Sequence, residues 1–176
     1  MAERHHYKTT ITSPVGELTL IATDIGLRAV LWPEDEPDRV KLPSPIADAS
    51  DNAILERAVA QLKQYFAGER TEFDLPLDLH GTEFQQLAWR SLASIPYGQT
   101  ATYGEQARRI GRPKAVRAIG AANGRNPVSI ILPCHRVVGA DGSLTGFAGG
   151  LDAKRQLLDF EIKYSRNPRT KQKAHQ

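Results

Sequence analysis

The sequence predicts an α+β protein of two domains, and two observations carry that prediction. Over residues 7–32, short runs that alternate apolar and polar side chains are separated by glycine-containing turns, a pattern typical of antiparallel strands. In the second half of the chain, apolar residues recur at helical spacing instead. We therefore expect a small antiparallel sheet with a helix over residues 1–80 and a mostly helical domain over residues 81–164. The basic segment 165–176 is expected to be a disordered tail.

The N-terminal domain is expected to be a meander of about three strands followed by one helix. Turns at residues 13–16 and 24–26 separate the strands. Residues 33–50 contain several prolines and many acidic side chains, so we expect a loop there. Apolar side chains recur at helical spacing over residues 52–66, and Gly68 follows the last turn, which predicts a helix with a glycine end.

Two further helices lie close together in the C-terminal domain. Thr102 is the expected cap of the first, which runs to residue 110, and the second covers residues 114–123 after a turn that contains glycine. This spacing is a helix-turn-helix outline. The second helix combines small residues with Lys114 and Arg117, which suits close approach to a polyanion. The alternative is tight packing of the small residues against a neighbouring helix.

The remaining elements of this domain flank the helix pair. A helix over residues 82–93 begins at Thr82, and Gln85 three residues later completes a capping-box pattern. A short apolar strand is expected over residues 128–132. A final helix covers residues 151–164, with four apolar side chains expected to face inward: Leu151, Leu157, Leu158 and Ile162.

Charge is distributed unevenly along the chain. Residues 98–176 hold 14 Lys and Arg against 5 Asp and Glu, whereas residues 1–97 hold 9 against 15. A strongly basic half favours a polyanionic partner, and nucleic acid is the leading candidate. The alternative is a solvated basic face followed by a charged tail.

The chain contains one cysteine and no long apolar segment. A single cysteine excludes an internal disulfide and a multi-cysteine zinc site, and a free thiol survives best in a reducing compartment. No apolar run approaches the ~20 residues of a membrane span, and we see no secretory signal. We therefore expect a cytoplasmic protein that binds no membrane, no metal and no cofactor.

The single cysteine, Cys134, stands between a proline and the pair His135–Arg136. A neighbouring positive charge lowers a thiol pKa and favours the nucleophilic thiolate, although a free cysteine is as often a buried apolar filler. Adjacent side chains point apart in helices and strands, so cooperation between Cys134 and His135 needs a turn or a bridging water. Glu161 on the last helix is our candidate to orient His135; the alternative is an exposed helix carboxylate.

Two classes of function remain open on these residues. A cysteine hydrolase would use acyl-enzyme chemistry, with the glycine-rich segment 146–150 as a source of an oxyanion hole. A nucleic-acid protein would use the thiol to attack a group on a base. The helix pair and the basic half favour the second class.

The residues around Cys134 belong to a longer pattern. Residues 131–138, Ile-Leu-Pro-Cys-His-Arg-Val-Val, resemble the active-site motif of the O6-alkylguanine-DNA alkyltransferases, also called methylated-DNA–protein-cysteine methyltransferases. Further matches follow in order and spacing at residues 97–98, 102–104, 111–118, 123–127, 146–151 and 154–161. The resemblance implies a bacterial single-function DNA-repair protein with a ribonuclease-H-like N-terminal domain.

The resemblance implies an irreversible reaction in which each molecule acts once. An alkyl group, typically methyl, passes from O6-alkylguanine, and also from O4-alkylthymine, to Cys134 after the base has been flipped out of the duplex. Five residues acquire implied catalytic roles: Cys134 as acceptor, His135 as base acting through a water, Glu161 as its orienting partner, Asn126 as a brace, and Tyr103 as a hydrogen-bond partner of the base.

The resemblance also implies how double-stranded DNA is bound. The second helix of the pair would enter the minor groove, with Arg117 inserted into the base stack and with Lys114, Ala118 and Tyr103 in contact with DNA. The base pocket would be lined by Phe147, Ala148 and Val137, where some relatives have tyrosine and serine at the first two positions. We expect a monomer, with or without cooperative clustering on DNA. The rivals are a sensor that binds alkylated DNA without repairing it, which would carry tryptophan in place of Cys134, and a helix-turn-helix regulator.

Overall fold

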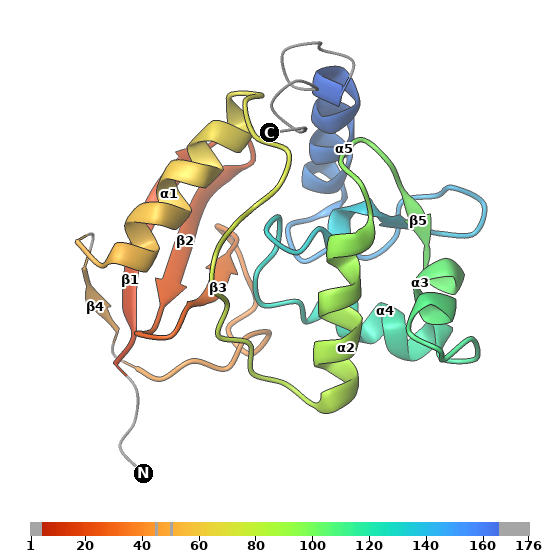
Figure 1. Ribbon diagram of the computed structural model, residues 1–176, viewed down its shortest axis with the longest axis horizontal. Helices are drawn as coiled ribbons and strands as arrows, with labels where there is room; N and C mark the ends of the chain where they lie inside the picture. The colour runs from red at the N-terminus through yellow and green to blue at the C-terminus, as the bar shows by residue number, and fades with distance from the viewer. Residues whose placement is uncertain (1–4, 45, 50, 166–176) are drawn as a thin grey trace.

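The protein has the predicted α+β fold, as seen in a computed structural model that describes residues 5–44, 46–49 and 51–165. The N-terminal part is a four-stranded sheet with the strand order β3-β2-β1-β4. One helix, α1 (Ala53–Phe66), packs on β1 and β2 (Figure 1). The strands are β1 (Tyr7–Ser13), β2 (Gly16–Ala22), β3 (Leu27–Leu31) and β4 (Ala47–Asp48).

The predicted meander is confirmed, and the sheet has one strand more. Strands β1 and β2 form a hairpin whose turn places Gly16 at φ 106°, a conformation that glycine adopts readily. The segment 33–50 was expected to be a loop, but β4 lies within it and pairs with β1 in parallel, so the sheet is mixed rather than antiparallel. A strand of two residues has no alternation of side chains from which it could be predicted.

Helix α1 presents its apolar stripe to the sheet, as its spacing predicts. Asn52 caps the helix, because its side-chain oxygen accepts hydrogen bonds from the amides of Ile54 and Leu55 at 3.0 Å. Leu55 and Tyr65 near its two ends are fully buried. The last turn therefore brings a tyrosine from the N-terminal part into the interior of the protein.

The C-terminal part is built from four helices with short connecting elements (Figure 1). The capping box at Thr82 is confirmed, and Thr102 caps the first helix of the pair. Helices α2, α3 and α4 pack on one another around a small cluster that includes Ala107 and Ile119. The elements are α2 (Glu83–Ser91), η1 (Leu92–Ser94), β5 (Ala101–Thr102), α3 (Tyr103–Arg109), α4 (Val116–Gly124), η2 (Cys134–Arg136), β6 (Val137–Val138) and α5 (Leu151–Ser165).

Three expectations for this part are corrected. Residues 128–132 form only isolated bridges, because Ile130 has a positive φ of 75° that breaks the strand. Two side chains of the last helix that were expected to face inward are exposed, Leu151 by 46 % and Ile162 by 39 %. The predicted tail was placed from residue 165, but Ser165 ends α5; residues 166–176 lie outside the described part.

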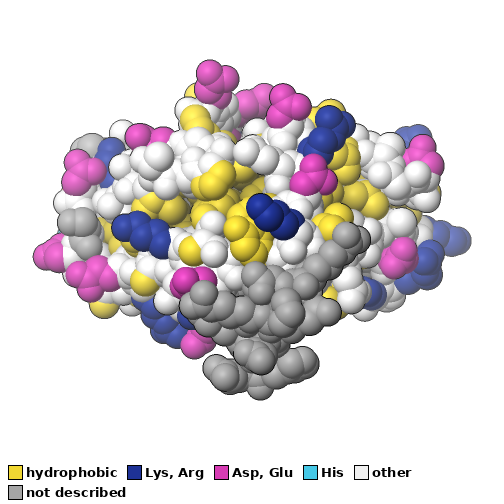
Figure 2. All heavy atoms as spheres, turned by 90° about the horizontal axis from the view of Figure 1, so that it is seen from above, with side chains coloured by type: hydrophobic (Ala, Val, Ile, Leu, Met, Phe, Trp, Pro, Cys, Tyr) yellow, Lys and Arg dark blue, Asp and Glu magenta, His cyan; other side chains and the backbone are white. Residues whose placement is uncertain are grey.

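The two parts of the chain share one hydrophobic core. Tyr65 of α1 stands in an aromatic cluster with residues from both parts, and its members are Tyr65, Phe66, Phe73, Tyr97 and Phe160. Seen from above, hydrophobic side chains gather near the middle of the molecule, between two ends that carry charged side chains (Figure 2). Within the described residues, no helix has the length and apolar character required to span a membrane.

Candidate active site

Cys134 lies at the start of the short helical turn η2, behind a strained loop. Ile130 in this loop has a φ of 75°, a conformation that is unfavourable for a β-branched residue and that persists only where surrounding contacts enforce it. Asn126 supplies two such contacts: its amide donates to the carbonyl of Leu132 at 2.8 Å, and its side-chain oxygen accepts from the amide of Val128 at 3.1 Å. The loop is thereby closed immediately before the cysteine.

The side chain of His135 bonds a carboxylate. Its Nε2 lies 2.7 Å from Oε2 of Glu161 on α5, and both side chains are buried. Its Nδ1 is buried and has no hydrogen-bond partner among the described residues. An ionised carboxylate only accepts hydrogen bonds, so Nε2 carries the proton and Nδ1 presents a lone pair. The 3-10 turn of η2 supplies the turn conformation that the sequence requires at Cys134–His135.

Glu161 is held as an anion by its surroundings. Arg136 donates from Nε to Oε1 at 2.7 Å and from Nη2 to Oε2 at 3.1 Å, and the hydroxyl of Tyr65 donates to Oε2 at 2.6 Å. Burial alone would raise the pKa of Glu161, but the charge and hydrogen bonds of His135 and Arg136 hold it well below its usual value. The alternative of an exposed helix carboxylate is therefore wrong, because Glu161 is 1 % exposed.

The thiol of Cys134 is buried, and its pKa is raised above the usual value. Burial raises the pKa of Cys134, while hydrogen bonds with Asn126 and Ser129 and the positive charges of Lys154 and Arg39 act in the opposite direction. The guanidinium of Arg136 bonds Glu161 and the carbonyl of Ile95, so the neighbouring cation in the sequence serves the carboxylate rather than the sulfur. Removal of the thiol proton therefore requires a base, and His135 Nδ1 is the unpartnered acceptor in the next residue.

The two cations whose charges act on the thiol, Lys154 and Arg39, come from opposite parts of the chain. Lys154 on α5 is 1 % exposed, and its ammonium donates to the carbonyl of Thr145 at 2.9 Å. Arg39 forms a buried pair with Asp35 at 2.6 Å and donates from Nη1 to the carbonyl of Asn126 at 2.7 Å. Lys154 thus ties the residue before the glycine-rich segment to α5, and Arg39 ties the loop of residues 33–50 to the start of the strained loop.

The other expected pocket residues lie around this centre. Tyr103 begins α3, and its hydroxyl lies 2.9 Å from Oγ1 of Thr145. Val137 is buried in β6, which pairs with β5. Phe147 and Ala148 are half-buried and pack against the shared core, with the ring of Phe147 edge-on to Trp32 at 5.2 Å between centroids.

Comparison with known proteins identifies the family. The 6-O-methylguanine DNA methyltransferase DNA-binding domain model matches residues 83–163, and the ribonuclease-like domain model of the same family matches residues 6–79. A methylated-DNA–protein-cysteine methyltransferase of Mycobacterium tuberculosis H37Rv is 51 % identical over 156 residues, which cover 89 % of this chain and 92 % of that protein. The chain belongs to the methylated-DNA–protein-cysteine methyltransferase family.

Other members of the family agree with this assignment. A methylated-DNA–protein-cysteine methyltransferase from Methanosarcina acetivorans is 46 % identical over 155 residues, covering 88 % of this chain and 97 % of the relative. The crystal structure of Mycobacterium tuberculosis OGT in complex with DNA superposes with a TM-score of 0.80 at 48 % identity, over 91 % of this chain and 94 % of that one. The enzyme of the archaeon Pyrococcus kodakaraensis, at 17 % identity and a TM-score of 0.52, shares the fold.

The expected DNA-contacting residues of this methyltransferase-family chain lie apart from the thiol. Lys114, Arg117 and Ala118 are exposed at the start of α4 and its preceding turn. A side-chain carbon placed at Gly120 or Gly124 of α4 would meet no atom within 4 Å among the described residues. The small residues on this face are therefore not required for packing inside the fold, which argues against the alternative of a tight helix contact.

Several residues of the site escape sequence reasoning. Lys154 and Arg136 lie within the segment that resembles the family. Their charged side chains are buried in the structure, and this burial marks them as part of the site. Arg39 and Tyr65 come from the N-terminal part. Arg39 lies 87 positions before Asn126, and Tyr65 lies 96 positions before Glu161. No local pattern indicates such contacts.

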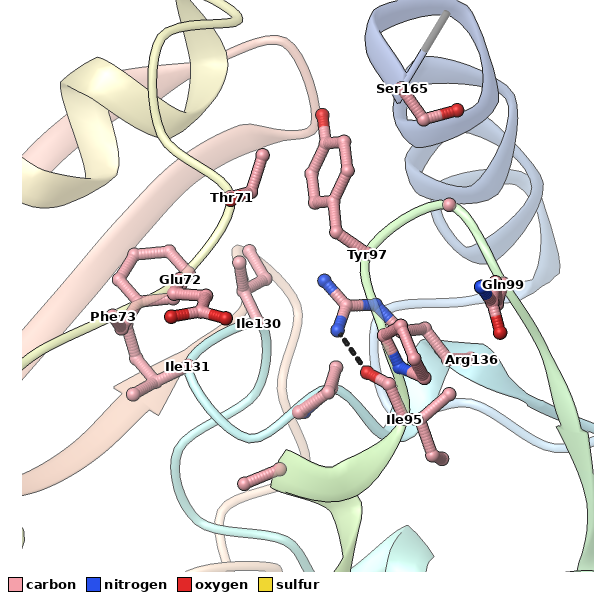
Figure 3. A pocket seen from close by; sticks show the side chains of 14 residues that line it. Thr71, Glu72, Phe73, Ile95, Tyr97, Gln99, Ile130, Ile131, Arg136 and Ser165 are labelled. Carbon is pink, nitrogen blue, oxygen red and sulfur yellow. Dashed lines mark hydrogen bonds between the residues drawn. The ribbon is translucent and has the colours of Figure 1, made fainter. Parts of the chain in front are cut away.

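A pocket of about 930 Å³ is lined in part by Arg136, the partner of Glu161. Its wall is formed by residues 71–73, the segment 95–99 and the strained loop, and Arg136 crosses it to reach the carbonyl of Ile95 at 2.7 Å (Figure 3). Tyr97 stands over the guanidinium at 5.5 Å. Among the described lining residues Cys134 is absent, so this pocket supports Arg136 and not the reacting thiol.

Proposed function

We propose that this chain is a DNA-repair alkyltransferase that moves an alkyl group, typically methyl, from O6-alkylguanine in double-stranded DNA to its own Cys134, and acts likewise on O4-alkylthymine. The observation that carries the proposal is the lone thiol beside a buried His135–Glu161 pair whose Nδ1 is unpartnered. The relatives named methylated-DNA–protein-cysteine methyltransferase support this class of reaction.

The reaction needs one proton transfer and one displacement. His135 Nδ1 takes the thiol proton through a water, and the resulting thiolate attacks the alkyl carbon in line with the departing oxygen. A sulfur–carbon bond forms, the carbon–O6 bond breaks, and its electron pair stays with guanine, which takes up one proton. Tyr103 hydrogen-bonds the base and stabilises the leaving guanine. The thioether product is not reversed, so each molecule acts once.

The division of labour follows the two parts of the chain. Residues 81–164 bind DNA and hold the active site, and residues 1–80 support it. The base must be flipped out of the duplex at a cost of a few kcal/mol. Arg117 fills the vacated place in the stack, while Ala118 and the glycines of α4 permit close approach in a minor groove about 6 Å wide. Phe147, Ala148 and Val137 line the base pocket.

The protein acts as a monomer without a cofactor. Its single thiol must stay reduced before it reacts, which suits a cytoplasmic location. A sensor that binds alkylated DNA without repair is disfavoured, because a nucleophile stands at position 134.

Mass spectrometry tests the proposal directly. After incubation with a duplex that contains O6-methylguanine, the peptide that bears Cys134 gains one methyl group, and the duplex regains guanine. Because the chain contains a single cysteine, any S-methylcysteine must be at this position. The Cys134→Ala variant is the control and gains nothing. Binding of the damaged duplex without an adduct would contradict the proposal and favour the sensor.

A further inference from the structure

The catalytic carboxylate is held by a residue from the other part of the chain. We propose that Tyr65 is a positioning residue for the alkyl transfer, because its hydroxyl fixes Oε2 of Glu161 in the place where that oxygen accepts the proton of His135 Nε2. The inference rests on the proposed function and assigns to the N-terminal part a direct role in the chemistry.

The geometry makes Tyr65 a rigid support. Its hydroxyl lies 2.6 Å from Oε2 of Glu161, the same oxygen that lies 2.7 Å from His135 Nε2. The side chain is 0 % exposed, so no water competes for this bond. Its ring is enclosed by the other members of the aromatic cluster, with centroids 5.0–6.1 Å away.

Three residues bond the carboxylate of Glu161: His135 and Arg136 from η2, and Tyr65 from α1. Burial and the nearby charge of Glu161 raise the pKa of Tyr97, after η1, but Tyr97 makes no bond to the carboxylate. Burial and the negative charge of Glu161 raise the pKa of Tyr65 well above its usual value, so its hydroxyl remains a neutral donor. A donor to the ionised form of a carboxylate lowers its pKa, and loss of that donor raises it.

Arg136 and Tyr65 have different functions in this network. Arg136 neutralises the charge of Glu161 and engages both carboxylate oxygens. Tyr65 adds no charge, but it holds Oε2 from α1 in the N-terminal part, whereas His135 and Arg136 belong to η2 in the C-terminal part. Without it, Oε2 remains bonded to His135 and to the longer contact with Arg136 at 3.1 Å. The carboxylate is then less precisely aligned with Nε2.

The chain offers a matched control. Tyr97 belongs to the same aromatic cluster, its ring lies 6.1 Å from that of Tyr65, and its buried hydroxyl has no hydrogen-bond partner among the described residues. Tyr65→Phe and Tyr97→Phe therefore remove the same atom from neighbouring rings, and only the first removal breaks a bond to Glu161. A difference between the two variants reports the bond and not the packing.

The experiment measures alkylation of Cys134 by free O6-benzylguanine as a function of pH, so that DNA binding does not enter. We expect Tyr65→Phe to react about tenfold more slowly near neutral pH. The acid side of its curve of rate constant against pH should lie about one pH unit higher, which corresponds to about 1.4 kcal/mol. Tyr97→Phe is expected to match the wild type. In a Glu161→Gln background, Tyr65→Phe should cause no further loss, because both changes act on one carboxylate.

The possible outcomes separate this inference from the proposed function. No adduct on the wild type would overturn the proposed function itself. An active wild type with an unchanged Tyr65→Phe rate and profile would overturn only the role of Tyr65. So would equal losses in the two tyrosine variants, additive losses in the Glu161→Gln background, or unfolding of Tyr65→Phe, since each of these would make Tyr65 a packing residue.

Discussion

Glu161 shows how single residues determine the chemistry of this site. Its carboxylate accepts four hydrogen bonds, from Tyr65, His135 and two nitrogens of Arg136. The anion therefore persists in a buried place where an unpaired charge would be costly. It also sets the tautomer of His135, and with it the free lone pair at Nδ1. In the proposed mechanism, the reactivity of Cys134 therefore depends on a carboxylate 27 positions further along the chain.

Glu161 is also expected to make stability depend on pH. Its pKa in the folded protein lies below the usual 4.5. The ionised carboxylate thus stabilises the fold at neutral pH, and this contribution is lost as the pH falls below about 4.5 toward the lowered pKa. In Glu161→Gln the contribution is absent, and Arg136 loses its counter-charge. We expect a loss of about 3 kcal/mol at neutral pH and a flatter decline of stability in acid.

Urea unfolding at neutral and at acidic pH checks this expectation. Asp159→Asn, an exposed carboxylate on the same helix, is the matched control and should behave as the wild type. Equal pH dependence of stability in Glu161→Gln and the wild type would show that the buried pair contributes nothing to the free energy of unfolding.

Helices α3 and α4 act together as one element. Gln106 of α3 and Asn123 of α4 exchange two amide hydrogen bonds at 2.8 Å and 3.1 Å, and both side chains are buried. Trp89 of α2 donates a hydrogen bond to the carbonyl of Ala122 at 2.7 Å and so holds α4 against α2. The inner face of α4 is thus held by polar contacts, and its outer face stays free for a ligand. A rigid helix with a small-residue surface is suited to enter a narrow groove.

Arg117 on this outer face is expected to matter for duplex DNA alone. Arg117→Ala should reduce the rate of repair of a duplex far more than the rate of reaction with free O6-benzylguanine, because insertion into the stack is needed only when a base is flipped. Comparison of the two rate constants in one variant gives the test.

The matched control for Arg117 is Arg57→Ala, an exposed arginine of α1 paired with Asp74 at 2.8 Å. It should leave both reactions unchanged. Equal losses of Arg117→Ala with duplex and free base would contradict the insertion role.

The two halves of the chain differ in charge and in what they contribute to the site. The basic excess lies in the second half of the chain, whereas the first half is acidic and supplies Arg39, Trp32 and Tyr65 to the interior of the site. Trp32 donates to Oγ of Ser129 at 3.2 Å and covers Gly149, where an added side-chain carbon would lie 2.6 Å from the indole ring. The two parts therefore form a joint core rather than two independent units.

This distribution of charge predicts a salt effect on duplex repair. Cations that neutralise phosphates release counterions, so the affinity for DNA falls as salt rises. We expect the rate of duplex repair at limiting protein to fall steeply with salt concentration, and the rate with free O6-benzylguanine to change little. Parallel salt titrations of both reactions check this, and the same slope in both would contradict a phosphate-binding surface.

Sequence patterns were sufficient for the longer elements and for the family. Alternation predicted β1 to β3, helical spacing and capping residues predicted α1 to α5, and the motif at Cys134 predicted the family to which the chain belongs. These signals are local, because a helix face or a capping box is written within a few consecutive residues. Short elements without such a pattern were missed, as β4 was, and Ile130 breaks a strand that its apolar neighbours predict.

Only the tertiary structure decided the electrostatics of the site. Burial turned the expected effect of Arg136 on the thiol into a bond with Glu161, and it raised the pKa of Cys134 instead of lowering it. It also brought the charge of Arg39 near Cys134 and the hydroxyl of Tyr65 to Glu161. Charge interactions and desolvation depend on distance in space, and spacing along the chain does not determine that distance. The sequence alone thus determined which residue we propose as the nucleophile, and packing decided which groups surround it.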